Sequence, residues 1–188
     1  RRSRGQLETL TGRPVLGYRA PDFSIVKESI WALEILAEEG FVYDASINPA
    51  VMARFGVPGF PRQPVRMALA GGAPLVELPV ATLSFFGRSL PVAGGGYHRL
   101  LPFPVIRWAI EKSVLAGETF MAYCHPYEFD PDEFAHLDCP LPLKTRLHQG
   151  LGRRGFENKF RRMLREFETT LALQVAEKAM TEAPVYEG

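Results

Sequence analysis

Short apolar segments of strand length alternate with helical segments along this chain up to residue 124. The order that they predict is helix, strand, helix, strand, long loop, strand, helix and strand. The expected strands cover residues 15–18, 41–43, 75–80 and 120–124. Helices that alternate with short apolar strands are typical of an α/β fold in which the strands pair in parallel. We therefore predict an α/β fold.

Glycine, proline and serine delimit the helices and loops between these strands. The expected helices cover residues 1–11, 24–39 and 104–116. The second of them is predicted to bury a broad apolar face that includes Trp31. Residues 45–64 are rich in Pro and Gly without an apolar period, which predicts a long surface loop of the kind that often carries function. Gly94–Gly96 predict a second flexible segment.

The composition of the chain changes after Pro142. A basic stretch leads into an expected helix with an apolar stripe from Phe156 to Leu171, and Lys and Arg cover the other face of that helix. We interpret this basic face as solvated. Residues 144–188 are accordingly predicted to be a helical extension that docks on a domain formed by residues 1–143.

The overall composition excludes several classes of protein. The 188 residues are 46% hydrophobic and 23% charged, as in a globular domain. A net charge of +1, from 22 basic and 21 acidic residues, argues against a protein that binds nucleic acid or a membrane surface. No apolar run reaches the ~18 residues that a membrane-spanning helix needs. Cys124 and Cys139 lack CxxC spacing, and the sequence leaves the cellular compartment open.

Three polar residues come directly after expected strands. Arg19, Asp44 and His125 each follow an apolar strand, and in α/β folds the active residues gather at the C-terminal ends of strands. Each residue also has a structural interpretation. Arg19 is a charge that needs an anionic partner if buried, Asp44 is placed to cap the following turn, and a histidine at a strand end is often structural.

Other chemical motifs are missing from the sequence. The four histidines, His98, His125, His136 and His148, include no pair at i, i+3 or i, i+4 spacing, and no Cys/His cluster indicates a metal site. No serine lies in a GxSxG elbow. Tyr97 and Arg99, which follow the three glycines, are candidates for contact with a sugar, and a plain loop is the alternative.

Two motifs carry a resemblance to a known family. Gly17-Tyr18-Arg19-Ala20-Pro21 and His125-Pro126-Tyr127-Glu128, in this order and at this separation, resemble motifs of polysaccharide deacetylases of the NodB-homology type. The likeness is to the group associated with exosortase and exopolysaccharide gene clusters. It continues through Tyr43-Asp44, the glycines before Tyr97 and the arginine-rich closing helix, so it covers nearly the whole chain.

The resemblance implies a fold and an activity. The family fold is a distorted barrel of parallel β/α units, of which residues 1–143 correspond to the C-terminal portion. The implied activity is metal-dependent hydrolysis of N-acetyl groups on a polysaccharide. In such enzymes a divalent metal, usually zinc, activates a water molecule near neutral pH. The implied partner is therefore an N-acetylated polysaccharide, related to exopolysaccharide biosynthesis.

The resemblance also implies roles for individual residues. His125 matches the histidine that protonates the leaving amine, and Arg19 matches the arginine that holds the catalytic carboxylate. The backbone N–H of Asp22 corresponds to an oxyanion contact. Asp44 is a possible support for His125, although the Asp-Trp pair of the family is absent around it. Tyr97 belongs to the implied substrate loop.

The metal ligands of the family lie upstream of the counterpart of Arg1. We therefore expect the chain alone to hold no metal and to be inactive. Two alternatives stay open: an amidohydrolase of the same superfamily that acts on a small amide, and a non-catalytic glycan-binding remnant.

The absence of clustered ligands gives a first prediction. The chain should bind zinc only weakly and without defined stoichiometry, because a firm site needs three or four converging His, Cys or carboxylate groups. Titration calorimetry with zinc measures this. One tight stoichiometric site would contradict the prediction.

Overall fold

Five short strands form one mixed sheet in the computed structural model, which describes residues 2–50, 55–85 and 88–187. In spatial order the strands are β1 (Gly17–Tyr18), β2 (Tyr43–Asp44), β4 (Val76–Glu77), β3 (Val65–Met67) and β7 (Val185–Tyr186). β1, β2 and β4 run parallel, whereas β3 is antiparallel to β4 and parallel to β7. The predicted α/β class is confirmed, including parallel pairing of the first strands.

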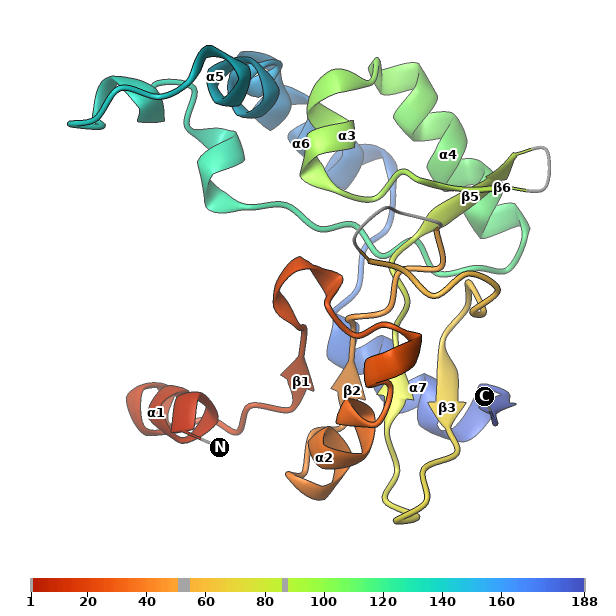
Figure 1. The fold of residues 1–188 in the computed structure, drawn as a ribbon. Helices are drawn as coiled ribbons and strands as arrows, with labels where there is room; N and C mark the ends of the chain where they lie inside the picture. The colour runs from red at the N-terminus through yellow and green to blue at the C-terminus, as the bar shows by residue number, and fades with distance from the viewer. Residues whose placement is uncertain (1, 51–54, 86–87, 188) are drawn as a thin grey trace.

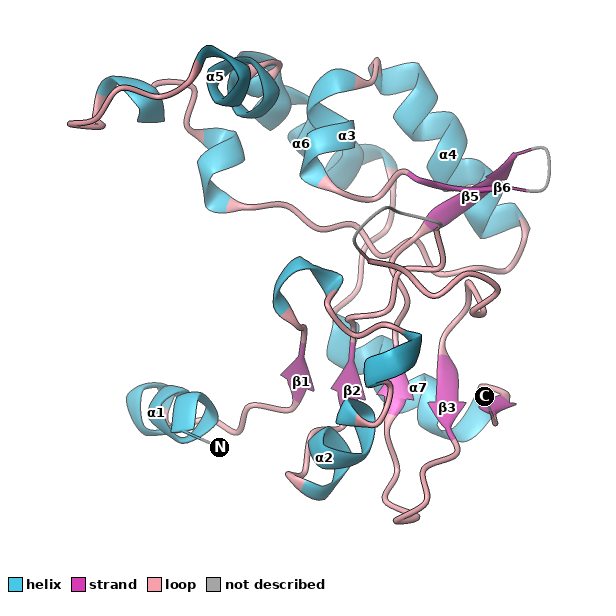
Figure 2. Cartoon of the chain, viewed as in Figure 1, coloured by secondary structure: helices cyan, strands magenta, loops and turns pink. Residues whose placement is uncertain are grey.

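A helix covers each face of this sheet (Figures 1 and 2). On one face Leu33 and Leu36 of α2 (Ala32–Glu38) share a buried cluster with Val65 of β3. On the other face Ala176 and Ala179 of α7 (Ala172–Glu182) pack with Val76 and Leu78. Both faces of the sheet are therefore covered, and the acidic residues Asp44 and Glu77 of the central strands are buried with it.

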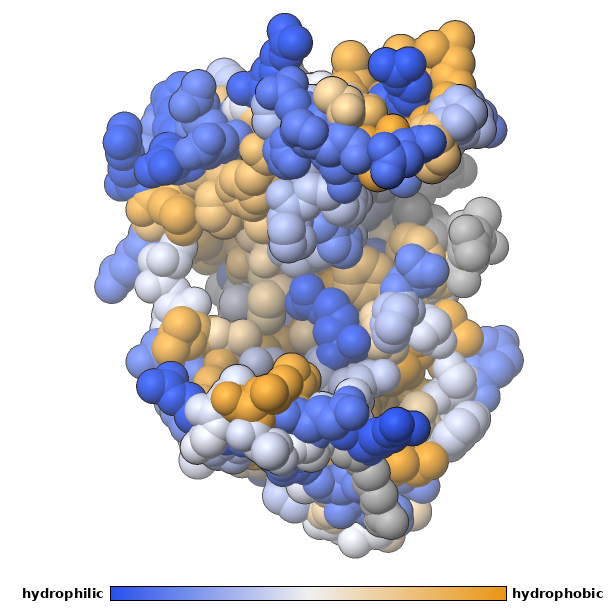
Figure 3. Space-filling view, turned by 90° about the vertical axis from the view of Figure 1, so that its left-hand side faces the viewer, coloured by the Kyte–Doolittle hydropathy of each residue, from blue (hydrophilic) through white to orange (hydrophobic). Residues whose placement is uncertain are grey.

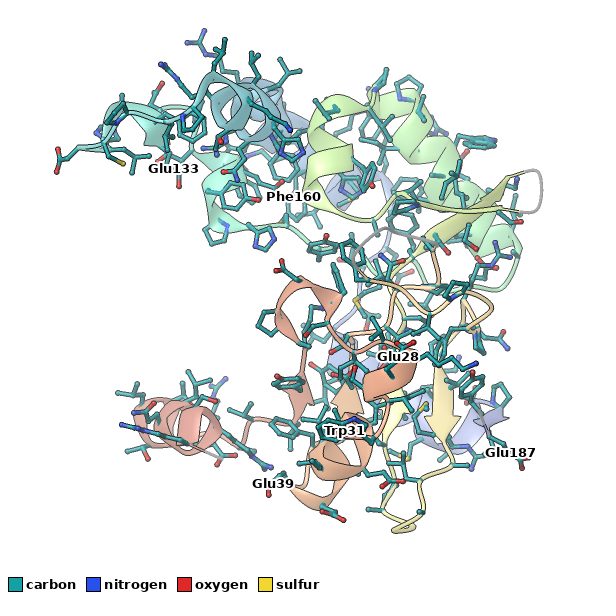
Figure 4. All side chains as sticks on the ribbon, in the orientation of Figure 1. Glu28, Trp31, Glu39, Glu133, Phe160 and Glu187 are labelled. Atoms are coloured by element: carbon teal, nitrogen blue, oxygen red, sulfur yellow. The ribbon has the colours of Figure 1, made fainter. Side chains whose placement is uncertain are left out.

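Most of the remaining helices form a second body above the sheet in Figure 1. It contains α3 (Gly95–Leu100), α4 (Phe103–Leu115), α5 (Leu143–Gly150), α6 (Arg153–Glu166) and the antiparallel pair β5 (Thr82–Phe85) and β6 (Arg88–Pro91). The apolar stripe of α6, with Met163 and Phe160, packs on Ile106 and Ile110 of α4 (Figure 4). Its basic face is exposed and carries i, i+4 ion pairs such as Arg161–Glu157. The first helix, α1 (Arg2–Thr11), projects from the opposite end of the molecule (Figure 1).

Residues 144–188 contribute to both bodies. They include α6 in the upper body, α7 on the face of the sheet, and β7, which pairs with β3 inside the sheet. The C-terminal segment is therefore part of the main core as well as a helical addition to it.

The expected strand over residues 120–124 is not formed. Its regular pairing is limited to an isolated parallel bridge between Tyr123 and Gly94, where the Tyr123 N–H donates to the Ala93 carbonyl at 3.0 Å. The other edge of this segment borders a hollow, so no neighbouring strand extends the ladder. The glycines expected to form a flexible segment instead begin α3.

Two expected helices are shorter than predicted. The helix over residues 24–39 is replaced by 3₁₀ turns at Pro21–Phe23 and Lys27–Ser29, followed by α2, and Trp31 is 59% exposed (Figure 4). The Ser29 hydroxyl bonds to nearby backbone carbonyls, which competes with a continuous helix. The stripe from Phe156 to Leu171 is broken because α6 ends at Glu166 and Phe167 is extended. Of the long loop, residues 45–50 and 55–64 contain no helix or strand, as predicted, and 51–54 lie outside the described residues. Its predicted surface position is wrong for residues 45–50, Val57 and Phe60, which are buried in the core.

His98 of α3 is an ionisable side chain in the upper core. It is 3% exposed, and its ring stacks on Phe120 with the centroids 6.2 Å apart. Burial lowers the pKa of His98 to about 4, and a hydrogen bond to the backbone of Val92 opposes this shift. The folded protein therefore holds a neutral histidine at pH values where the unfolded chain binds a proton.

This gives a prediction for stability against pH. Below the unfolded pKa of 6.5 the unfolded chain gains a proton that the folded state excludes, so this contribution falls by roughly 2–3 kcal/mol between pH 6.5 and 4. The free energy of unfolding of a His98→Gln variant should lack this component, since glutamine does not titrate. Denaturant titrations over this pH range measure it, with His148→Gln, an exposed histidine, as the control. Identical profiles for the parent and His98→Gln would contradict the burial of a neutral imidazole.

Candidate functional site

Arg19 lies just beyond β1 and lines a hollow of about 350 Å³ beside the edge of the sheet. Its Nε donates to the Ala45 carbonyl at 2.8 Å, and its guanidinium carbon lies 5.3 Å from the ring centroid of Tyr123 and 5.7 Å from that of Phe23. Among the described residues no carboxylate forms an ion pair with Arg19. Figure 3 shows the molecule hollowed at its waist, between the upper helices and the sheet.

Asp44 lies at the end of β2, fully buried, beside Glu77 of β4. The two residues are partners in the parallel register, so their side chains share one face of the sheet. Asp44 accepts hydrogen bonds from the Ser46 hydroxyl at 2.7 Å and the Ser46 N–H at 3.1 Å. Glu77 accepts one from the Ile47 N–H at 2.9 Å. Both carboxyl groups thus hold the turn at residues 45–47, as expected for Asp44 in its structural interpretation.

Burial dominates the electrostatics of this carboxyl pair. It raises the pKa of Glu77 well above its usual range, and the neighbouring Asp44 raises it further. Burial also raises the pKa of Asp44, whereas the hydrogen bonds of Asp44 with Glu77 and Ser46 lower this pKa. Within the described residues, the hydrogen bonds of Asp44 are made to Ala45, Ser46 and Glu77 and not to His125, for which Asp44 was a possible support.

His125 is exposed at the end of the apolar segment that precedes it. Its ring stacks on Tyr127, with centroids 5.2 Å apart and planes 8° apart, and meets the Tyr123 ring edge-on at 5.9 Å. The Tyr123 ring therefore contacts both Arg19 and His125. Burial, then Glu128 and Tyr97, raise the pKa of Tyr123, whereas Arg19 lowers it. Tyr97, which is 37% exposed, thus also neighbours this ring.

Asp22 and Phe23, in the turn after Arg19, have unusual backbone conformations. Their φ angles are +55° and +51°, in the left-handed region that residues other than glycine seldom occupy. Such residues cost on the order of 1–3 kcal/mol each and cluster at functional sites. The Ala20 N–H donates to the Ser46 hydroxyl at 2.7 Å, and the Phe23 ring packs edge-on against Tyr123 at 5.0 Å. These contacts hold the turn in place.

Glu128 fixes the backbone of His125. This carboxylate is 1% exposed and accepts the His125 N–H at 2.9 Å, while the Arg99 Nε donates to it at 3.0 Å. Arg99 in turn donates to the carbonyls of Gln149 and Leu151. A Cβ at Gly95 would collide with the Glu128 carboxylate, so this position of α3 needs glycine.

Sequence reasoning missed Glu77, Ser46, Tyr123 and Glu128 as site residues. Arg99, a candidate for contact with a sugar, is instead buried in the ion pair with Glu128. Glu77 carried a usable signal, because a single acid inside the apolar run Leu75–Val80 implies a buried carboxyl group that needs partners. Glu128 belongs to the His-Pro-Tyr-Glu motif. Arg99 and Glu128 are far apart in the chain, so no local sequence pattern predicts that they form an ion pair.

Residues 2–50, 55–85 and 88–187 contain no group of three or more His, Cys, Asp or Glu side chains that could hold a metal ion. The described residues therefore do not fit the metal that the resemblance implies. Cys124 and Cys139 are both free thiols. Within the same residues, no helix is long and apolar enough to cross a membrane.

An α/β domain with polar residues gathered at the ends of its parallel strands is the class that this geometry defines. The model of a protein family described as a domain of unknown function (DUF3473) matches residues 45–177. The chain belongs to this family. Searches of curated proteins and of solved structures give no match. The matched range includes Glu77, Tyr123 and His125, begins directly after Asp44, and spans both sides of residue 144.

The buried Arg99–Glu128 pair yields a prediction. Glu128→Gln removes the charge opposite a buried guanidinium, which should destabilise the fold by about 3–5 kcal/mol. It should also speed hydrogen exchange at the His125 amide. Denaturant unfolding and amide exchange measure the two effects.

The matched control is Glu157→Gln, which removes a carboxylate from an exposed pair with Arg161 and should cost less than about 1 kcal/mol. Equal effects of the two substitutions would contradict the proposed role of Glu128.

Proposed function

We propose that this chain carries part of the active site of a metal-dependent carbohydrate deacetylase that acts on N-acetylated polysaccharide. The proposal rests on the resemblance of its two motifs, together with one observation about Arg19. The side chain of Arg19 is held through Nε, stacks near two aromatic rings and lines a hollow, and no described residue forms an ion pair with it.

Such an arginine is suited to hold a carboxylate. With Nε bonded to Ala45, the terminal nitrogens can take a carboxylate, for which the planar guanidinium is preferred over lysine. In the proposed site that carboxylate is the catalytic base, supplied from outside this chain. Arg19 keeps it ionised and fixes its direction.

His125 is proposed to be the general acid. An amine is a poor leaving group until it is protonated, and a histidine can deliver that proton near neutral pH. Its exposed ring, bordered by Tyr123 and Tyr127, is open to a bound sugar. Backbone N–H groups near Asp22, and the half-buried Tyr97, are proposed to contact the substrate.

The proposal includes the barrel and the metal. β1 lies at the edge of the sheet, and Met121 and Ala122 of the apolar segment border the same hollow as Gly17 and Tyr18. We place the strands that would close a barrel, with the metal ligands that they carry, between these two edges. Because the described residues do not fit a metal, the roles proposed for Arg19 and His125 involve no step on the metal.

The test is an assay of the natural full-length protein with its divalent metal restored. Acetate release from N-acetylated oligosaccharides is compared with ammonia or acid release from small linear and cyclic amides. The proposal expects the oligosaccharides to be cleaved, and cleavage to be lost in His125→Ala. Activity on the small amides alone would favour the amidohydrolase alternative, and glycan binding without hydrolysis would favour a non-catalytic role.

Arg19→Lys gives the sharper prediction. Lysine keeps the charge and loses the planar pair of donors, so turnover should fall by ~10²-fold while KM changes little. Turnover per folded molecule and the Tm are measured on the same sample. A variant with a lowered Tm and full turnover would show that Arg19 is structural.

A further inference from the structure

Glu77 has no role in the sequence motifs, yet it lies at the base of the site. Its carboxyl group and that of Asp44 are adjacent on neighbouring parallel strands, and both residues are 0% exposed. Oε1 of Glu77 accepts the Ile47 N–H, whereas Oε2 is buried and no donor reaches it among the described residues. The group next to that oxygen is the Asp44 carboxylate.

The charges around Asp44 and Glu77 determine the protonation state of the pair. Two carboxylates side by side away from water repel each other strongly, and Arg19 is the cation that lowers the pKa of Glu77. One proton on Oε2 of Glu77 removes the repulsion and lets this otherwise unpartnered oxygen donate to the Asp44 carboxylate. The result is one negative charge near one positive charge.

The turn at residues 45–47 transmits this arrangement to Arg19. Glu77 holds the N–H of Ile47 and Asp44 holds the N–H of Ser46. The same turn presents the Ala45 carbonyl to the Arg19 Nε, and the Ser46 hydroxyl to the N–H of Ala20. The position of the guanidinium thus depends on the two carboxyl groups beneath it.

We propose that Glu77 is a positioning residue for Arg19, and that its neutral carboxyl group donates a hydrogen bond to the Asp44 carboxylate beneath the 45–47 turn. The inference rests on the proposed function only for its consequence in catalysis. The hydrogen bonds and the protonation state can be tested whatever the reaction is.

The surroundings favour a neutral Glu77. Burial raises the pKa of Glu77, and Asp44 raises it further, while the Ile47 N–H and Arg19 lower it. Tyr43 and Tyr123 are the other ionisable groups that face Arg19. Because the folded pKa lies above the unfolded value of 4.5, the unfolded chain loses this proton first as pH rises. Stability from Glu77 is therefore greatest below pH 4.5 and decreases above it.

Carbon-13 NMR of the carboxyl groups in the full-length protein tests the protonation state directly. At pH 7 the Glu77 carboxyl carbon should resonate as a neutral acid, and Asp44 as a carboxylate. Ionised signals from both residues at pH 7 would overturn the proposal.

Substitution by glutamine tests the hydrogen bonds, since glutamine mimics the neutral acid. Glu77→Gln should leave the Tm unchanged at pH 5, within about 2 °C, and raise it by roughly 2–4 °C or more at pH 8, where the parent must retain a proton. Glu128→Gln, a buried glutamate that faces Arg99 directly, is the matched control and should lower the Tm at both pH values. A Glu77→Gln variant that behaves like Glu128→Gln would overturn the proposal.

The positioning role is read from the Nε–H signal of Arg19. Glu77→Asp keeps the acid but is one methylene too short to reach both Ile47 and Asp44, so the Arg19 Nε–H should exchange with solvent at least ~10-fold faster. Glu77→Gln should preserve the slow exchange. If exchange is unchanged in a folded Glu77→Asp variant, Glu77 does not position Arg19. This readout involves no turnover, so failure of the deacetylase proposal would not alter it.

Discussion

The structure around the candidate site depends on a buried carboxyl pair. Asp44 and Glu77 lie side by side on parallel strands and hold the backbone of the 45–47 turn. The turn then fixes Arg19 through the Ala45 carbonyl. Buried carboxyl groups are tolerated only when their hydrogen bonds are made. This constraint couples the ends of β1, β2 and β4, which are far apart in the sequence. It leaves the guanidinium of Arg19 facing the hollow.

A second polar network supports the other side of the site. Arg99 pairs with Glu128 under His125 and reaches the carbonyls at the end of α5. Lys159 of α6 donates to three carbonyls at the end of α3, among them that of Arg99. The basic C-terminal segment therefore determines where His125 lies. This agrees with a family match that runs continuously from residue 45 to residue 177.

Local sequence signals were sufficient for part of this architecture. The apolar strands before Arg19 and Asp44, the helix that ends at Leu115 and the α/β class follow from periodicity and from glycine and proline positions. The predicted strand over residues 120–124 was wrong because an apolar segment needs a partner edge to become a strand, and this half-buried segment has one only at Tyr123. β3 was not predicted because its three residues, with Arg66 at the centre, form no apolar run, and β7 was not predicted because it joins the sheet from the far end of the chain. Gly17 belongs to the Gly-Tyr-Arg-Ala-Pro motif. A glycine fits there because the Tyr43 ring leaves no room for a Cβ at residue 17.

Arg19 and His125 both contact the Tyr123 ring, with the guanidinium carbon 5.3 Å and the imidazole centroid 5.9 Å from the centroid of that ring. Nuclear Overhauser effects from the Tyr123 ring protons in the full-length protein measure this convergence most directly. The account predicts effects to the Arg19 side chain and to the His125 ring in the same spectrum. Effects to one of these residues alone would show that Arg19 and His125 do not form one site.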